Sequence, residues 1–272
     1  MDEFENKSPV VRNDLFGRLD IYASFDDITA DNVKEELNSA LVFHVKNMLQ
    51  EEFLYWYRRN VMPILHRTKE VREDILNRVP VNIAASVVEF KNGYFLTQPA
   101  FYVGRRKGVQ RKVKDMNEYL YRSGKNDADN KAADWFHTVG KGVIFVEPSN
   151  ENGVPYRAYA LDPRSAFVVY SLKPGNKPVM GVNFVVNDGK ARFDVFTEKN
   201  VFHLSGVTTG KMITYENNCN FLATAVSLDS VEPNPLGKIQ IIEYRYNNVN
   251  MSSFESAIPL IDEISNIYSN AC

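Results

Sequence analysis

The sequence DADNKAADWFHTVGKGVIFVE, residues 127–147, contains the point at which the chain changes from helical to extended character. Before Gly140, acidic residues stand at the start and apolar residues further on. This order is typical of a helix, whose N-terminal end favours negative charge. After Gly140, β-branched and aromatic residues follow one another, which indicates a strand. The pattern predicts helices upstream of Gly140 and strands downstream of it.

Upstream of Gly140 the sequence predicts a series of helices. The first begins near Thr29, a fair N-cap, and Pro63 breaks or kinks it. Asn92 and Gly93 close a later helix, because Gly can adopt the left-handed conformation of a helix C-cap. Apolar residues three or four positions apart give the first helix one apolar face: Val33, Leu37, Leu41, Val45 and Met48. The other predicted helices cover residues 64–78, 81–91, 113–122 and 127–139.

Downstream of Gly140 the sequence predicts strands and one last helix. The run Asn187-Asp188-Gly189-Lys190 is typical of a hairpin turn. Helices and strands are segregated along the chain rather than alternating. The fold class is therefore α+β, with N-terminal helices, an antiparallel β meander and a C-terminal helix. The predicted strands cover residues 142–147, 156–161, 166–171, 179–187, 191–197, 200–205 and 239–246, and the helix covers 254–270.

The domain organisation follows from this order. The length of 272 residues allows one large domain or two small ones. We expect residues 1–28 to form an N-terminal arm and residues 29–272 to form one domain. Within that domain we expect a helical part at 29–139, a sheet part at 140–250 and a final helix at 254–272.

Composition narrows the class of protein. There are 32 basic and 34 acidic residues, a formal net charge of −2, so the chain has no broad basic field for coating nucleic acid. The two cysteines, Cys219 and Cys272, are too few for a secreted disulfide framework, which favours a reducing compartment. No apolar run approaches the roughly 20 residues of a membrane span, and the polar start is no signal peptide. These features indicate a cytoplasmic protein without a membrane partner.

The residue types that carry catalysis are present but scattered. Asp127 and Asp129 are spaced like divalent-metal ligands, yet two acids also suit the first turn of a helix, which Asn126 or Asp127 would cap. We interpret them as structural. We expect His44 and His137 to be hydrogen-bonded interior residues. The four histidines stand far apart in sequence (His44, His66, His137 and His203), and we predict no catalytic residue, no metal site and no cofactor.

Two basic clusters are candidates for contact with DNA or a partner protein. The first is Arg58-Arg59 with His66-Arg67 and Lys69, close to Tyr55, Trp56 and Tyr57. Aromatic and basic residues together can contact nucleic acid. A charged helix face paired with Glu51, Glu52, Glu70 and Glu73 explains this cluster better. The second cluster lies in a predicted exposed loop and has fewer acidic residues near it than the first, so it is the stronger candidate. Its residues are Arg105, Arg106, Lys107, Arg111 and Lys112.

Several segments together resemble the portal proteins of siphophage-type tailed phages. One is Asp162-Pro163-Arg164-Ser165-Ala166-Phe167, which is similar to a strand, Asp-Pro, strand junction in that family. Another is residues 234–244, which resemble the segment before the family's long helix, with Gln240 where Pro is usual. No single motif is specific, but together the motifs follow the order seen in that family over about residues 50–272. The remaining similar segments are residues 58–60, 78–82, 90–96 with Pro99, 117–120 with 127–130, and 140–147.

The resemblance implies a structural protein and not an enzyme. Such portals form a ring, usually of twelve subunits, at one capsid vertex, through which DNA is packaged and ejected. The implied partners are other portal subunits, capsid and scaffolding proteins, the packaging motor, head-completion proteins and DNA. The implied location is the virion, with assembly in the host cytoplasm.

The match corresponds to the N-terminal wing of such a portal, with the stem, clip and crown missing. We therefore expect a truncated form that cannot make a working portal alone. The alternatives are a prophage remnant that binds full-length portal and, more remotely, a metal-dependent transferase.

Overall fold

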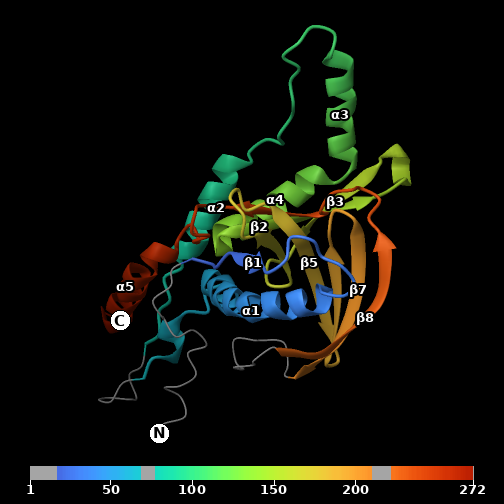
Figure 1. Cartoon of the computed structure of the whole chain (residues 1–272). Helices are drawn as coiled ribbons and strands as arrows, with labels where there is room; N and C mark the ends of the chain where they lie inside the picture. The colour runs from blue at the N-terminus through green and yellow to red at the C-terminus, as the bar shows by residue number, and fades with distance from the viewer. Residues whose placement is uncertain (1–16, 69–76, 210–221, 272) are drawn as a thin grey trace.

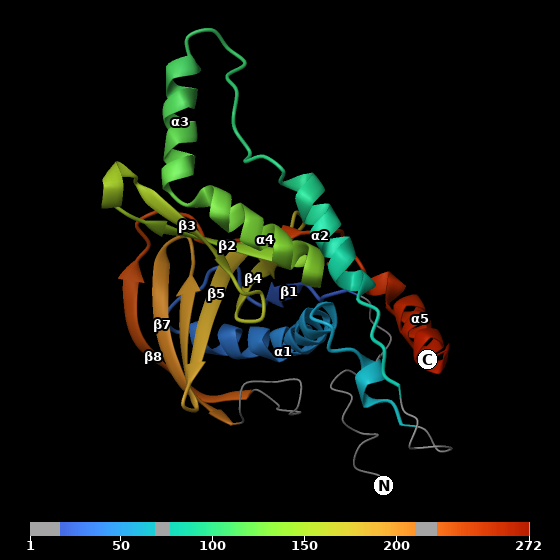
Figure 2. The same cartoon turned by 180° about the vertical axis from the view of Figure 1, so that it is seen from behind.

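The computed structural model describes residues 17–68, 77–209 and 222–271. Four layers are stacked in its body: helix α1 (Val33–Arg58), a large sheet, a small sheet and helix α4 (Lys125–Val139). Figures 1 and 2 show α1 and α4 on opposite sides of the sheets. Helices α2 (Ile83–Phe95) and α5 (Ile258–Ala271) lie beside this stack, and α3 (Gln110–Arg122) stands off it.

The large sheet has the strand order β1-β4-β5-β6-β7-β8, and the small sheet has the order β3-β2-β9. All pairs are antiparallel except β1–β4, where Ile21 lies opposite Val169 in a parallel pair. The strands of the large sheet are β1 (Ile21–Ala23), β4 (Ala166–Ser171), β5 (Pro178–Asn187), β6 (Lys190–Phe196), β7 (Asn200–Thr209) and β8 (Leu222–Pro233). Those of the small sheet are β2 (Lys141–Pro148), β3 (Tyr156–Leu161) and β9 (Ile241–Arg245).

The α+β class is confirmed: apart from the short β1, the strands follow helices α1 to α4, and α5 follows the strands. The predicted antiparallel meander occurs in β4 to β7 of the large sheet, while β2, β3 and β9 form a second sheet that was not predicted. Strand β8 was not predicted. The seven strands predicted downstream of Gly140 all occur, with ends that differ by a few residues.

The main core lies between α1 and the large sheet. The predicted apolar face of α1 packs there, with Leu37 fully buried against strand residues such as Phe167 and Phe193. His44 is also buried in this layer, stacked on Phe167 with ring centroids 4.1 Å apart. This burial, rather than intrinsic helix propensity, stabilises the helix.

The two sheets and α4 pack unusually close together, and two glycines make this possible. A Cβ atom added to Gly142 in β2 would lie 2.4 Å from the carbonyl oxygen of Ala132 in α4. A Cβ atom added to Gly181 in β5 would lie 2.7 Å from Cβ of Ile241 in β9. Any larger residue at either position would push the layers apart.

A second core joins the C-terminal half of α1 to α2, α4 and α5. Tyr57 is fully buried beside Phe254, with stacked rings 6.1 Å between centroids. The Tyr57 hydroxyl donates a hydrogen bond to Asp262 Oδ1 over 2.8 Å. Among the helices in the described part of the chain, none has the length and apolar character that crossing a bilayer requires.

Several predicted helix ends are wrong. Helix α1 begins at Val33, so Asn32 rather than Thr29 precedes it. Helix α2 continues through Asn92 and Gly93 to Phe95, because the left-handed conformation is not used there.

Two further helix predictions also differ from the structure. Gly124, not Asn126 or Asp127, precedes α4. The predicted helix at 64–78 is a 3-10 turn at Pro63–His66 followed by non-helical chain at 67–68 and 77–78, while 69–76 lie outside the described residues.

Gly140 ends α4 in the left-handed conformation, with φ 88°. The change from helix to strand therefore occurs where the sequence predicts it. A Cβ atom there would lie 2.1 Å from the carbonyl oxygen of Asn250. Position 140 consequently requires glycine for two reasons, its backbone conformation and its contact with the segment before α5.

A candidate interaction surface

Residues 96–122 form a protrusion that stands off the body, made of an extended segment and helix α3 (Figures 1 and 2). Helix α3 buries none of its residues against the described part of the chain. A helix of this length is marginal in water without tertiary packing. The protrusion therefore contributes little to the stability of the fold. Its side chains are available for contact with another molecule.

One asparagine fixes the two halves of the protrusion together. Asn117 in α3 accepts a hydrogen bond from the backbone N–H of Tyr102 over 2.8 Å and donates one to the carbonyl oxygen of Tyr102 over 2.9 Å. Gly104 lets the extended segment approach α3 closely, since a Cβ atom there would lie 2.7 Å from Cγ2 of Val109. These contacts give the protrusion a defined shape.

The five predicted contact residues all lie on the outer part of the protrusion. Arg105, Arg106 and Lys107 occupy the loop at its far end, and Arg111 and Lys112 lie in the first turn of α3. All five are exposed, and none forms an ion pair within the described part of the chain. Positive charge at a helix N-terminus opposes the helix dipole. The positive charges therefore destabilise the start of α3 in the isolated chain. A negative charge on another molecule would offset this effect.

Apolar side chains accompany these charges. Phe101 is 69% exposed and Val103 is 79% exposed on the extended segment, and Tyr121 on α3 is 74% exposed. None of these exposed apolar residues was among the predicted contact residues. The signal was the adjacent triplet Phe101-Tyr102-Val103, three large apolar residues in a loop. Aromatic residues beside arginines are the composition of protein interfaces.

A groove of about 450 Å³ lies at the base of the protrusion, where it meets α4 and the small sheet. Apolar side chains form most of its wall. They include Phe95 of α2, Phe136 of α4 and Tyr244 of β9. The groove continues the apolar surface of the protrusion onto the body.

The first basic cluster is structural. Arg58 pairs with Asp134 and donates to Thr138 Oγ1 over 2.8 Å, so it joins α1 to α4. Arg59 lies over the ring of Tyr55, 4.3 Å from its centroid. The glutamates predicted to pair with this cluster do other things. Glu52 pairs with Arg164, Glu51 is buried, and Glu70, Glu73 and Lys69 lie outside the described residues.

The histidines divide into two cases. His44 is buried and its Nε2 lies 3.0 Å from the carbonyl oxygen of Arg164, as predicted, and burial lowers its pKa to about 3. His137 is also buried, but neither ring nitrogen has a hydrogen-bond partner in the described part of the chain, so that half of the prediction is wrong. Burial lowers the pKa of His137 to about 4. Both side chains are neutral at pH 7.

Asp127 and Asp129 do not point at a common centre. Asp127 pairs with Lys131 at 2.7 Å, and Asp129 accepts from Lys125 at 2.6 Å, so both are helix-surface pairs one turn apart. Of the two predicted first-turn acids, only Asp127 lies in the first turn of α4, and Asp129 lies just after it. Within the residues that the structure describes, no group of three His, Cys, Asp or Glu side chains could hold a metal ion. The two cysteines lie outside the described residues.

Replacing Arg105, Arg106, Lys107, Arg111 and Lys112 together with Ala is expected to leave the fold intact. All five side chains are exposed, and surface substitutions of this kind change stability by no more than about 0.5 kcal/mol each. Removal of positive charge from the N-terminus of α3 also acts in the stabilising direction. Thermal unfolding followed by circular dichroism checks this. A loss of more than about 4 kcal/mol, well beyond the sum of five surface effects, would show that the protrusion belongs to the core of the fold.

A projecting surface of charge and exposed aromatics, rather than a pocket of converging reactive groups, is typical of a protein that assembles with others. A comparison with protein-family models matches residues 47–272 to the phage portal proteins of the SPP1 Gp6-like type. The chain belongs to this family. Portal proteins are structural components of the virion that take part in DNA packaging and head–tail connection. A comparison with curated proteins gives no match.

Proposed function

We propose that the chain is a subunit of a portal ring at one capsid vertex, through which phage DNA enters during packaging and leaves during ejection. The observation that carries this proposal is the family match over residues 47–272. Its role is structural: the subunit supplies shape and contact surfaces. The partners that follow are further portal subunits, capsid and scaffolding proteins, the packaging motor and head-completion proteins.

The protrusion supports this proposal independently of the match. A ring subunit needs at least two different surfaces, since each copy contacts one neighbour on each side. The outer part of the protrusion, with Arg105, Arg106, Lys107, Arg111 and Lys112, is our candidate for one of them. It projects far enough from the body to reach a neighbouring molecule (Figure 1).

The purified chain is expected to associate as its concentration rises, because ring contacts lie within the matched residues. Sedimentation velocity is the measurement. The expected result is a mass that increases from the 31.1 kDa of one chain toward multiples of it. A chain that stays at 31.1 kDa up to its solubility limit would contradict the proposal that these residues form ring contacts.

A further inference from the structure

The charge of the chain is unevenly divided between the protrusion and the body. The protrusion, residues 96–122, has seven basic and two acidic residues, a net charge of +5. The whole chain carries −2, so the remaining residues together carry −7; the residues outside the described ranges account for −3 of this and the described body for −4. A basic projection on an acidic body is electrostatically complementary to the body of another copy.

One part of the body combines exposed acids with exposed apolar side chains. Residues 25–35, which we call the acidic end, contain four acids and one lysine. Asp31 and Glu35 are exposed and form no ion pair within the described part of the chain, whereas Asp27 pairs with Lys199 on the surface. The apolar side chains are Phe25 and, on the adjoining turns of α1, Val42 and Phe43. This composition mirrors that of the protrusion.

The two surfaces lie on opposite sides of the same molecule. The acidic end leads into α1, which covers the outer face of the large sheet, and the protrusion leaves the body beyond α4. Both views show the sheets between them (Figures 1 and 2). A copy therefore cannot place its own protrusion on its own acidic end.

We propose that the protrusion of one copy docks on the acidic end of a second copy, with Arg105, Arg106 and Lys107 facing Asp27, Asp31 and Glu35. This inference rests on the proposed ring function and names the surfaces that make the ring contact. Such a contact joins two different patches, so it adds copies head to tail and closes when the rotation between them permits. The exposed aromatics of the protrusion then contact the apolar side chains beside the acidic end.

A second copy fits the protrusion better than nucleic acid does. Phosphate contacts account for basic residues, but they give no role to Val103 or Met116, which are exposed beside them. The fully buried core of a protein interface needs such apolar side chains. DNA remains as a distinct outcome of the test.

Charge reversal on each side separates these possibilities. One variant carries R105E, R106E and K107E, and a second carries D27K, D31K and E35K. Each is expected to weaken self-association in sedimentation velocity by at least about tenfold, since like charges would meet across the contact. A control with K177E, K190E and R192E makes the same change in charge as the first variant, at exposed positions in or next to strands of the large sheet, and is expected to associate like the wild type.

Mixing the variants gives the sharper result. Contacts between unlike variants are complementary, because one pairs the two native surfaces and the other pairs the two reversed surfaces, so an equimolar mixture is expected to recover association with the two variants alternating. A chain that carries both reversals is expected to self-associate again, because the charges are exchanged and still complementary. Circular dichroism of each variant verifies that it is folded.

Four outcomes would overturn the inference. Wild-type association that both reversals leave unchanged would place the ring contact elsewhere while the proposed function stands. Equal weakening by the control would show a general charge effect. If the protrusion variant associates normally but loses salt-sensitive binding to a DNA duplex, the partner is nucleic acid. Absence of any wild-type association would contradict the proposed function as well.

Discussion

Replacing Glu255 with Ala is expected to lower the free energy of unfolding by about 3–5 kcal/mol, the cost of breaking a buried ion pair by removing one partner. Glu255 pairs with Arg18, and both side chains are shielded from solvent. Its second carboxylate oxygen accepts from the backbone N–H of Gly17 over 3.0 Å. Ser252 N–H also donates to the carboxylate, over 2.8 Å. The alanine variant would leave the Arg18 guanidinium buried without its anion.

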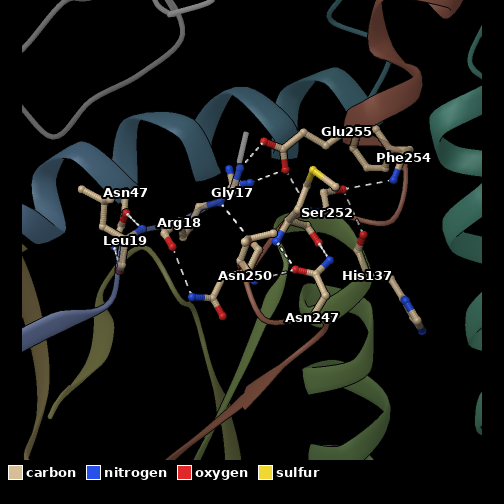
Figure 3. Close-up of polar contacts among 12 residues, drawn as sticks. Gly17, Arg18, Leu19, Asn47, His137, Asn247, Asn250, Ser252, Phe254 and Glu255 are labelled. Atoms are coloured by element: carbon tan, nitrogen blue, oxygen red, sulfur yellow. Dashed lines mark hydrogen bonds and ion pairs between the residues drawn. The ribbon is translucent and has the colours of Figure 1, made fainter. Parts of the chain in front are cut away.

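The same contacts hold the start of the described chain against the segment before α5. Arg18 donates from its backbone N–H to the carbonyl oxygen of Val249 over 3.0 Å, and its Nε donates to that of Asn250 over 3.2 Å. Asn250 donates in return to Arg18 O (Figure 3). It also donates to Asp20 Oδ1 over 2.9 Å. Strand β1 follows directly, so the parallel β1–β4 pair depends on this anchor.

Chemical denaturation at pH 7 measures the effect. Glu255→Gln keeps an acceptor for Gly17 and is expected to lose less stability than Glu255→Ala. Glu263→Ala, at an exposed position of α5, is the matched control and is expected to change stability by no more than about 0.5 kcal/mol. A Glu255→Ala variant that loses less than about 1 kcal/mol would show that the pair is not needed to anchor the N-terminal segment.

Local patterns in the sequence predicted local structure well. The turn Asn187-Asp188-Gly189-Lys190 joins β5 to β6 as predicted, with Asp188 and Gly189 both at positive φ. The change at Gly140 and the apolar face of α1 were also predicted. In each case the chemistry that decides the conformation lies within a few residues of sequence.

Pairing between distant segments was not predictable in the same way. Arg18 and Glu255 are 237 residues apart, and nothing near either one in sequence indicates the other. Strand β9 pairs with β2 instead of extending the meander, because Gly181 leaves room for Ile241 to pack across the two sheets. Strand β8 was not predicted, because its sequence consists largely of small and polar residues and contains few β-branched and no aromatic ones.

The basic residues on the surface of the protrusion were predicted as contact residues, but its exposed aromatic residues were not. The positive charges of Arg105 to Lys107 could be recognised because these residues are adjacent in sequence and few acidic residues lie near them. Its exposed aromatics could not be distinguished from core residues, because exposure depends on what the rest of the fold places beside them. The acidic end has the same limitation: Asp31 and Glu35 look like ordinary first-turn acids until the surface around them is known.

Glu51 is expected to make stability depend on pH in an unusual direction. Burial raises the pKa of Glu51 to about 7 from its ordinary 4.5, against the opposing effect of Lys141 and Arg18. Its Oε2 has no hydrogen-bond partner in the described part of the chain. A raised pKa means that the folded state keeps the proton that the unfolded state has already lost. The contribution of Glu51 to stability therefore falls as pH rises from 4.5 to 7.

Other groups obscure this trend in the wild type. Burial lowers the pKa of His44 to about 3 and that of His137 to about 4, from an ordinary 6.5. Both histidines bind protons more readily in the unfolded state, so their contributions fall as pH falls below 6.5, which is the opposite sign. The total curve mixes the two effects. The difference between the wild type and Glu51→Gln removes the histidines, because both proteins contain them.

That difference is the decisive quantity. The amide of Glu51→Gln does not titrate, so the variant is expected to gain about 3 kcal/mol relative to the wild type between about pH 4 and pH 8. Urea unfolding across this range measures it, with Glu89→Gln at an exposed position of α2 as the control. A flat difference would mean that folding does not raise the pKa of Glu51, so that the folded state ionises Glu51 at the same pH as the unfolded state. Lys141 and Arg18 would then compensate the burial of Glu51 and hold it as a buried anion at pH 7.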